Sequence, residues 1–268
     1  MTTERMPPTG SPLGAKSGRQ AELPSVDQSA STKLLPFVLS AIAGSVDIIG
    51  FLGLDQLFTA HITGNIVILA ARLVADEPAP VAHMISVPVF IAVLIIAKSL
   101  VAALERLRIA SLVPLLLLQV LLLFGFLAMG TAAGTQIDPK AATMIFAGML
   151  GVSAMALQNA LVRVALLGAP STAVMTTNIT VFTMDVGEML LARDPSRIAN
   201  ARKRAGRTWP AILGFLLGCI LGGAGAAVIG LRSLVLPTGL ALLALVLGIA
   251  GARHTVQSSP SISEERPA

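Results

Sequence analysis

Long apolar runs, separated by short polar or basic stretches, dominate the pattern along the 268-residue chain. About 20 apolar residues in a helix cross the roughly 30 Å core of a bilayer, and in lipid each backbone amide has to be satisfied within its own segment. The pattern therefore predicts an all-α, polytopic transmembrane bundle between a disordered tail at 1–33 and a second tail at 253–268. Eight apolar segments make up this bundle: about Leu34–Leu54, Thr59–Val74, Ile85–Leu104, Ala110–Ala133, Ala141–Ala165, Thr172–Leu191, Ala211–Leu231 and Leu234–Ala252.

Composition supports the membrane interpretation. The chain is 54% hydrophobic and only 12% charged, whereas about a quarter of the residues of a soluble domain are charged. The net charge of +5 is explained by basic residues beside the apolar runs, and with no Tyr and one Trp we expect no nucleic-acid partner. The single cysteine, Cys219, excludes an intramolecular disulfide and a zinc site of the cysteine type.

The second and sixth segments share a motif. TAHITGNI at 59–66 aligns without a gap with TAVMTTNI at 172–179, an offset of 113 residues. Five positions match: Thr59, Ala60, Thr63, Asn65 and Ile66 recur as Thr172, Ala173, Thr176, Asn178 and Ile179. The alignment predicts two four-segment repeats, about 34–133 and 141–252, although small residues and threonines also recur in membrane bundles because they let helices approach closely.

The distribution of basic residues favours one topology over another. If the second and sixth segments are partial or re-entrant helices, six segments cross, and only Arg72, Lys140 and Arg232 of the 19 basic residues lie outside. If all eight segments cross, five basic residues lie outside. Both arrangements place the N- and C-termini in the cytoplasm, and the positive-inside rule favours six crossings. With six crossings the two repeats are inverted relative to each other, a design that transporters use.

Two stretches carry a family resemblance. The sequence FVLSAIAGSVDIIGFLGLDQLFTAHITGNIVILA at 37–70 and the sequence GVSAMALQNALVRVALLGAPSTAVMTTNIT at 151–180 resemble the two signatures of the YoaK-like family of bacterial multi-pass inner-membrane proteins. The resemblance implies a location in the bacterial inner membrane and a domain of unknown function, and names no activity. The second signature of that family commonly reads Thr-Gly-Asn, so Thr177 replaces a glycine here.

The shared motif supplies the strongest candidates for a substrate site. If each copy opens a partial helix, free N–H groups and the positive end of the helix dipole point at a pocket that suits a small polar or anionic solute. The same side chains could instead cap helices and bond neighbouring helices. These candidates are Thr63, Gly64, Asn65, Thr176, Thr177 and Asn178.

Other polar residues at membrane depth extend the candidate site. A carboxylate such as Asp47 inside a span costs at least about 2.5 kcal/mol unless it faces protein or water, so it marks either a proton or cation site or a structural hydrogen bond. Gln158 and Asn159 fall near Asp47 in the repeat alignment and are expected to line the same pocket. His61 and His83 are expected at the outer interface, too isolated for a metal site.

Two acids in the sixth segment have two interpretations. Asp185 and Glu188 are three residues apart and share one helical face with Asn178. They could relay protons, or they could end a cytoplasmic helix and pair with the arginines of the basic stretch 193–207.

These features favour a secondary transporter or permease for a small polar or anionic solute. The alternative is a non-transport membrane scaffold that binds a partner or anionic lipid through 193–207. No nucleophile elbow, zincin motif or phosphate-binding loop occurs, so we expect neither an enzyme nor a cofactor. Gly214, Gly218 and Gly222 form a small-residue ridge that packs within the chain or between the protomers of a homo-oligomer.

Overall fold

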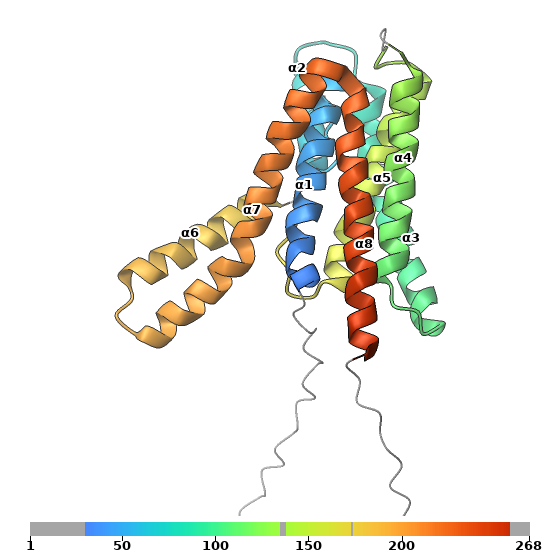
Figure 1. Ribbon diagram of the computed structural model, residues 1–268. Helices are drawn as coiled ribbons and strands as arrows, with labels where there is room; N and C mark the ends of the chain where they lie inside the picture. Colours follow the sequence, from blue (N-terminus) through green and yellow to red (C-terminus); the bar gives the residue numbers. More distant parts are fainter. Residues whose placement is uncertain (1–29, 135–137, 173, 258–268) are drawn as a thin grey trace, which may run out of the picture.

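The computed structural model describes residues 30–134, 138–172 and 174–257, and this part of the chain is helical with no strand. It confirms the predicted all-α class (Figure 1). The predicted N-terminal tail lies outside the described residues up to position 29, whereas 30–33 already belong to the first helix, and the last helix continues past 252. The helices are α1 (Ala30–Gly53), α2 (Ile62–Val74), α3 (Val81–Arg106), α4 (Leu112–Ala132), α5 (Ala142–Ala165), α6 (Met175–Leu191), α7 (Pro195–Ile229) and α8 (Val235–Gln257), with a 3₁₀ turn η1 (Gly230–Leu234) before α8.

Six of these helices are long enough to cross a membrane. Within the described residues, α1, α3, α4 and α5 are apolar candidates for spans, and a fifth continuous candidate contains both α7 and α8. The other two helices are shorter: α2 has 13 residues and α6 has 17, or roughly 20 and 26 Å of helix. This division agrees with the prediction of six full crossings and two partial helices.

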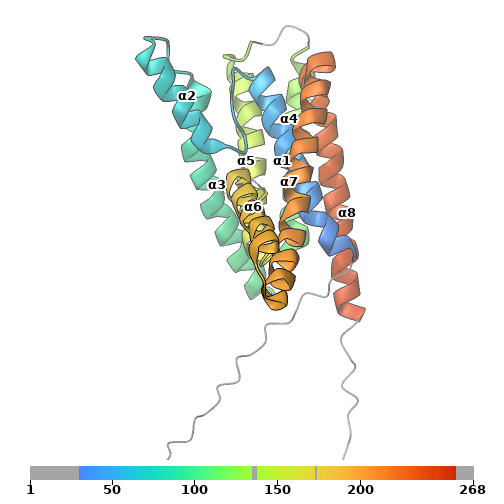
Figure 2. The same ribbon diagram turned by 90° about the vertical axis from the view of Figure 1, so that its left-hand side faces the viewer.

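The chain path explains why α2 and α6 are partial. α1 rises to the upper end of the bundle, and the chain then turns back inward, so that α2 starts inside the bundle and runs outward to the upper end (Figure 2). α5 descends, and α6 starts near the middle and runs to the lower end (Figures 1 and 2). Asp55 and Gln56 make the first reversal with positive φ angles of 52° and 67°, and Gly168, at 81°, lies in the second.

The two halves of the chain exchange packing partners. α1 and α5 are the most buried spans, and α7 and α8 pack along α1 while α3 and α4 pack along α5. Each half therefore covers the first helix of the other half, and α4 also contacts α8. This arrangement is expected for an inverted duplication, and the repeat itself stays a prediction that the packing supports.

Helices α1 and α7 approach unusually closely. Gly214, Gly218 and Gly222 lie one turn apart on α7, and a Cβ on any of them would collide with the α1 backbone at Phe37, Ala41 and Ser45 in turn. The glycine ridge therefore packs within the chain, because only a hydrogen at these positions leaves room for the other backbone.

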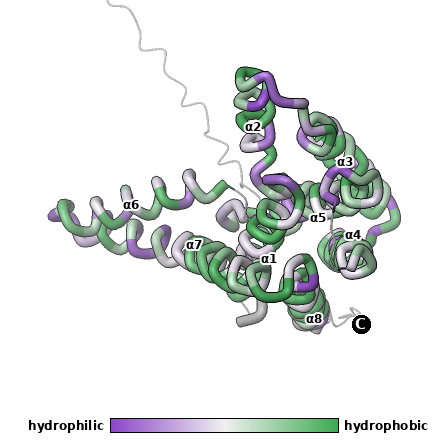
Figure 3. The backbone as a smooth tube through the Cα atoms, turned by 90° about the horizontal axis from the view of Figure 1, so that it is seen from above, coloured by the Kyte–Doolittle hydropathy of each residue, from purple (hydrophilic) through white to green (hydrophobic). Residues whose placement is uncertain are grey.

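The basic stretch 193–207 is mostly helix and not a loop. Asp194 caps α7 by accepting the Ser196 N–H at 2.9 Å, and Pro195 follows at the first helical position. The first turns of α7 lie beside α6, and the pair projects sideways from the bundle (Figure 1). Seen from above, α2 and α6 leave the bundle in different directions, and hydrophobic residues cover much of the helix surface (Figure 3).

Candidate functional site

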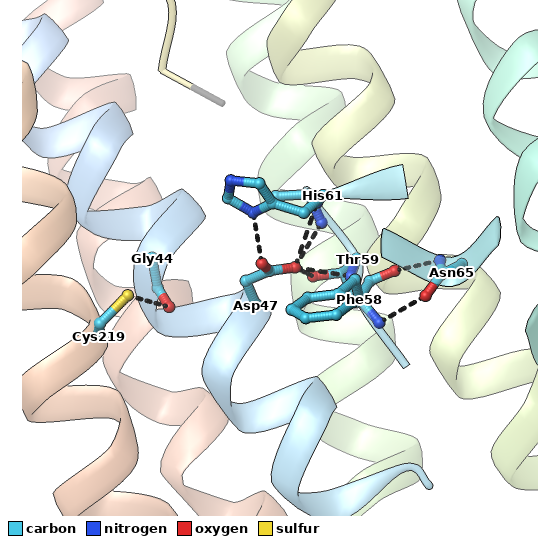
Figure 4. A network of polar contacts seen from close by, with 8 residues as sticks. Gly44, Asp47, Phe58, Thr59, His61, Asn65 and Cys219 are labelled. Atoms are coloured by element: carbon cyan, nitrogen blue, oxygen red, sulfur yellow. Dashed lines mark hydrogen bonds and ion pairs between the residues drawn. The ribbon is translucent and has the colours of Figure 1, made fainter. Parts of the chain in front are cut away.

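Asp47 of α1 anchors the chain segment that enters α2 (Figure 4). Its Oδ1 accepts the N–H groups of Thr59 at 2.8 Å, Ala60 at 2.7 Å and His61 at 3.4 Å, and the Thr59 hydroxyl at 3.3 Å. Its Oδ2 lies 2.6 Å from Nδ1 of His61. A carboxylate only accepts hydrogen bonds, so Nδ1 carries a hydrogen and donates it to Asp47. The predicted intramembrane carboxylate is therefore a buried structural acceptor that also orients a histidine.

Asn65 closes the same segment from the other side. Its Oδ1 accepts the Phe58 N–H at 2.9 Å, and its Nδ2 donates to the Phe58 carbonyl at 2.7 Å and to the Ser86 hydroxyl at 3.0 Å. The side chain is fully buried. Its hydrogen-bonding groups are thus engaged within the chain, as in the structural alternative of the sequence analysis.

The second half repeats this plan with neutral groups. Gln158 of α5 takes the place of Asp47, and its Nε2 donates to the Thr172 hydroxyl and to the Leu39 carbonyl, both at 2.9 Å. Its Oε1 accepts from Gln119 of α4 at 2.7 Å. Asn178 donates to the Ser171 carbonyl, seven residues earlier, the same spacing as between Asn65 and Phe58. Both halves therefore fix the start of a partial helix with one polar residue on the central helix and one asparagine.

The replacement of a glycine by Thr177 has a packing explanation. A Cβ on Gly64 would lie within 3 Å of the Phe58 ring. At the corresponding position of the second half Ser171 stands in place of the phenylalanine, and Thr177 is exposed. Gly64 is therefore required by an aromatic neighbour that the second half lacks.

A cavity of about 950 Å³ lies between the openings of the two partial helices. α2 contributes Ile62 and Thr63, and α6 contributes Met175 and Thr176. No described residue accepts a hydrogen bond from the N–H groups of these four residues, as expected for the first turn of a helix. Asn159 also lines this cavity, so of the candidate site residues the structure brings Thr63, Asn159 and Thr176 to its wall.

The titratable side chains that line the cavity among the described residues are all basic. They are His61, Lys98 of α3 and Arg163 of α5, and no Asp or Glu occurs among its described lining residues. Neither Lys98 nor Arg163 forms an ion pair with another residue in the described ranges. Both side chains are exposed, and a cavity wall that carries cations but no described carboxylate is suited to an anion.

The acids Asp185 and Glu188 lie elsewhere. Arg204 of α7 donates to Asp185 Oδ1 at 2.7 Å and to Glu188 Oε2 at 2.7 Å, and Arg197 donates to Glu188 Oε1 at 3.0 Å. These contacts join α6 to the start of α7, which is the ion-pair interpretation of the two acids. Neither acid lines the cavity.

Three residues of the cavity were not predicted as site residues. His61 was predicted to lie at the outer interface, and this was wrong, because the chain folds back into the bundle before α2 and brings the His61 ring against Asp47. Lys98 and Arg163 come from helices far apart in sequence. His83 is buried near the start of α3, where its Nε2 lies 3.3 Å from the Gln56 carbonyl.

Fold and site together define a helical membrane protein with two partial helices that open onto one cavity. The profile of a family described as "Protein of unknown function (DUF1275)" matches residues 35–247, and the chain belongs to this family. This family agrees with the YoaK-like resemblance of the two signatures. No curated protein and no solved structure matched the chain.

Proposed function

We propose that this protein is a secondary transporter or permease for a small anionic solute, which binds in the cavity between the openings of α2 and α6. The observation that carries the proposal is the combination of His61, Lys98 and Arg163 with no carboxylate on the described cavity wall. A volume of about 950 Å³ is within the range of small-molecule sites, so a small anion with part of its hydration shell fits.

The two partial helices add to this positive potential. The first turn of each helix lines the cavity, so the positive end of each helix dipole lies beside it, and the N–H groups of the four lining residues have no acceptor among the described residues. Broken or partial helices from two inverted units that meet near the membrane midplane are a common arrangement in secondary transporters.

The proposed orientation places the lower end of the bundle, with the first turns of α1 and the last turns of α8, in the cytoplasm of a bacterial cell. The end of α2, the start of α5 and η1, which carry or adjoin Arg72, Lys140 and Arg232, lie at the upper end, and the first turns of α7 lie toward the lower end (Figure 1). The positive-inside rule therefore supports this orientation. Single cysteines at 76–80, in a Cys219→Ser background, should react with an impermeant maleimide in whole cells. Protection from outside, with reaction only after lysis, would contradict it.

Flux through proteoliposomes tests the transport proposal. We expect purified protein to raise the flux of at least one anion among chloride, nitrate, sulfate, phosphate and succinate above that of empty liposomes. Replacing both Lys98 and Arg163 by Gln should reduce this flux at least tenfold, because the cavity loses its permanent positive charges. The matched control is Arg232→Gln, which removes a basic residue near the upper end and should leave the flux unchanged. Folded wild-type protein that moves none of these anions would refute the proposal.

The lipid-binding alternative has one structural observation in its favour. Arg197 and Arg204 pair with the acids of α6, but Arg193, Arg202 and Lys203 are exposed without an ion pair to any described residue. A row of such cations beside apolar spans attracts anionic headgroups. If this surface binds lipid, phosphatidylglycerol in nanodiscs should raise the melting temperature of the wild type more than that of a variant with Gln at these three positions. Equal shifts would count against lipid binding.

A further inference from the structure

His61 and Asp47 form a two-residue unit at the wall of the cavity. The His61 Nδ1 donates a hydrogen bond to Asp47 Oδ2 at 2.6 Å. The imidazole also makes an edge-type contact with the Phe215 ring of α7, at a centroid distance of 5.4 Å. Nε2 has no hydrogen-bond partner among the described residues and points away from Asp47 (Figure 4). About a third of the side chain remains exposed, and the residue lines the cavity. The ring therefore has one fixed nitrogen and one available nitrogen.

The arrangement decides where a proton can bind. Asp47 accepts four donors on Oδ1 and the imidazole on Oδ2, so both of its oxygens are engaged. Nε2 of His61 is the remaining basic position in this unit. A histidine that donates Nδ1–H to a carboxylate gains stability as an imidazolium when Nε2 takes up a proton, as in other carboxylate–histidine pairs.

The charged groups that contact His61 or line the same cavity link this protonation to the contents of the cavity. α1 contributes the negative Asp47, α3 contributes Lys98 and α5 contributes Arg163, while α7 contributes the uncharged Phe215 and the thiol of Cys219 beside Gly44. The first turn of α6 adds no titratable side chain to the cavity wall. In the empty cavity the two cations oppose a third positive charge. A bound anion offsets them, so anion binding and proton uptake at Nε2 favour each other.

We propose that His61, positioned by Asp47, is the proton-coupling residue of this protein, so that one proton enters and leaves the cavity with each anion. This inference rests on the proposed anion transport. The proton comes from water on one side, occupies Nε2 while the anion is bound, and returns to water on the other side with the anion. Asp47 is a positioning residue, since it keeps Nε2 directed away from the carboxylate.

Proton uptake on binding tests the coupling without requiring transport. The five anions of the flux experiment are titrated calorimetrically into detergent-solubilised protein at pH 7.5. The difference between the binding enthalpies in HEPES and in Tris gives the number of protons taken up per anion. We expect a value approaching one for the wild type and near zero for His61→Asn, whose amide can still donate to Asp47. His254→Gln, in the last turn of α8, is the matched control and should retain the uptake.

The outcomes separate the two proposals. An anion that binds with equal proton uptake in wild type and His61→Asn overturns the coupling and leaves the transport proposal standing. If none of the five anions binds or moves, both proposals fail. If His61→Asn does not fold, ¹⁵N NMR of the histidine side chains in the wild type provides the test instead. His61 should then become protonated as the anion is added, and an unchanged signal with the anion bound would overturn the coupling.

Discussion

The two partial-helix openings solve the same structural problem with different chemistry. α2 and α6 begin 113 residues apart, at Ile62 and Met175, the offset of the aligned motifs. A returning chain segment precedes each helix. In each case an asparagine in the first turn of the helix donates to the backbone carbonyl seven residues earlier, Asn65 to Phe58 and Asn178 to Ser171. On α1, however, the anchor is the carboxylate of Asp47, whereas on α5 it is the neutral amide of Gln158.

This difference separates what the fold requires from what function adds. An amide is enough to hold a returning segment, as Gln158 shows with its bonds to Thr172 and Leu39. The first half uses a costlier buried carboxylate and directs it at a histidine on the cavity wall. Under the proposed coupling, a carboxylate in only one half gives one proton-binding unit per cavity, which is the number that one-to-one coupling needs.

A larger side chain on the glycine ridge of α7 should have the largest effect on folding. α7 packs against α1 through glycines, whereas α3, which packs against α5, contains no glycine. The change therefore tests how far the packing of α1 depends on these glycines. Gly218→Leu forces a side chain into the α1 backbone at Ala41. Overpacking of this kind should cost about 3 kcal/mol, so little folded protein is expected by size-exclusion chromatography in detergent. Gly239→Ala in α8, where a Cβ meets open space, is the control and should be tolerated. A monodisperse Gly218→Leu protein would show that the contact between α1 and α7 does not depend on the close approach of their backbones.

The asparagine clamps should differ in strength. Asn65→Ala leaves the Phe58 N–H and carbonyl without partners and also removes the bond to Ser86, so we expect a loss of about 2 kcal/mol. Asn178→Ala removes the bond to the Ser171 carbonyl and the weak contact with Met175 Sδ at 3.8 Å, and should cost about 1 kcal/mol. Thermal unfolding in the same detergent measures both. Equal losses would mean that the clamps contribute alike despite their different contacts.

Much of the fold could be predicted from sequence because hydrophobic length and repetition are local signals. The short second segment and the matched motifs around Asn65 and Asn178 predicted two partial helices, and the structure has them where the motifs begin. The helical start of α7 was missed although Asp194 and Pro195 are a readable capping signal. The predicted seventh segment begins only at Ala211, because the basic residues of 193–207 interrupt the apolar pattern.

The site was less predictable, because it depends on how the chain returns into the bundle. The sequence does not show that the residues after α1 fold inward through positive φ angles at Asp55 and Gln56, and this reversal is what carries His61 from the predicted interface to Asp47. Lys98 and Arg163 meet at the cavity only because α3 packs along α5, a long-range contact between the two halves.

The smallest expected effect concerns the helices that follow the two openings. α7 starts at a side-chain cap, Asp194, whereas α3 starts after Pro80 with no side-chain cap. Hydrogen bonds from the Ser196 N–H and hydroxyl hold the pKa of Asp194 below its usual value of about 3.8. Because the folded pKa is the lower one, the stabilisation is complete above about pH 4 and is lost as the pH falls through the folded pKa.

Asp194→Asn keeps a capping oxygen but removes the titration. We expect its melting temperature at pH 7 to fall by a degree or less, and the difference from wild type to disappear between pH 4 and pH 2. Asp194→Ala removes the cap altogether and should be less stable than Asp194→Asn at every pH. The difference in melting temperature between wild type and Asp194→Asn could instead stay constant from pH 7 to pH 2. That result would show that the carboxylate charge does not stabilise the start of α7. The start of α7 would then differ from the uncapped start of α3 only in its backbone.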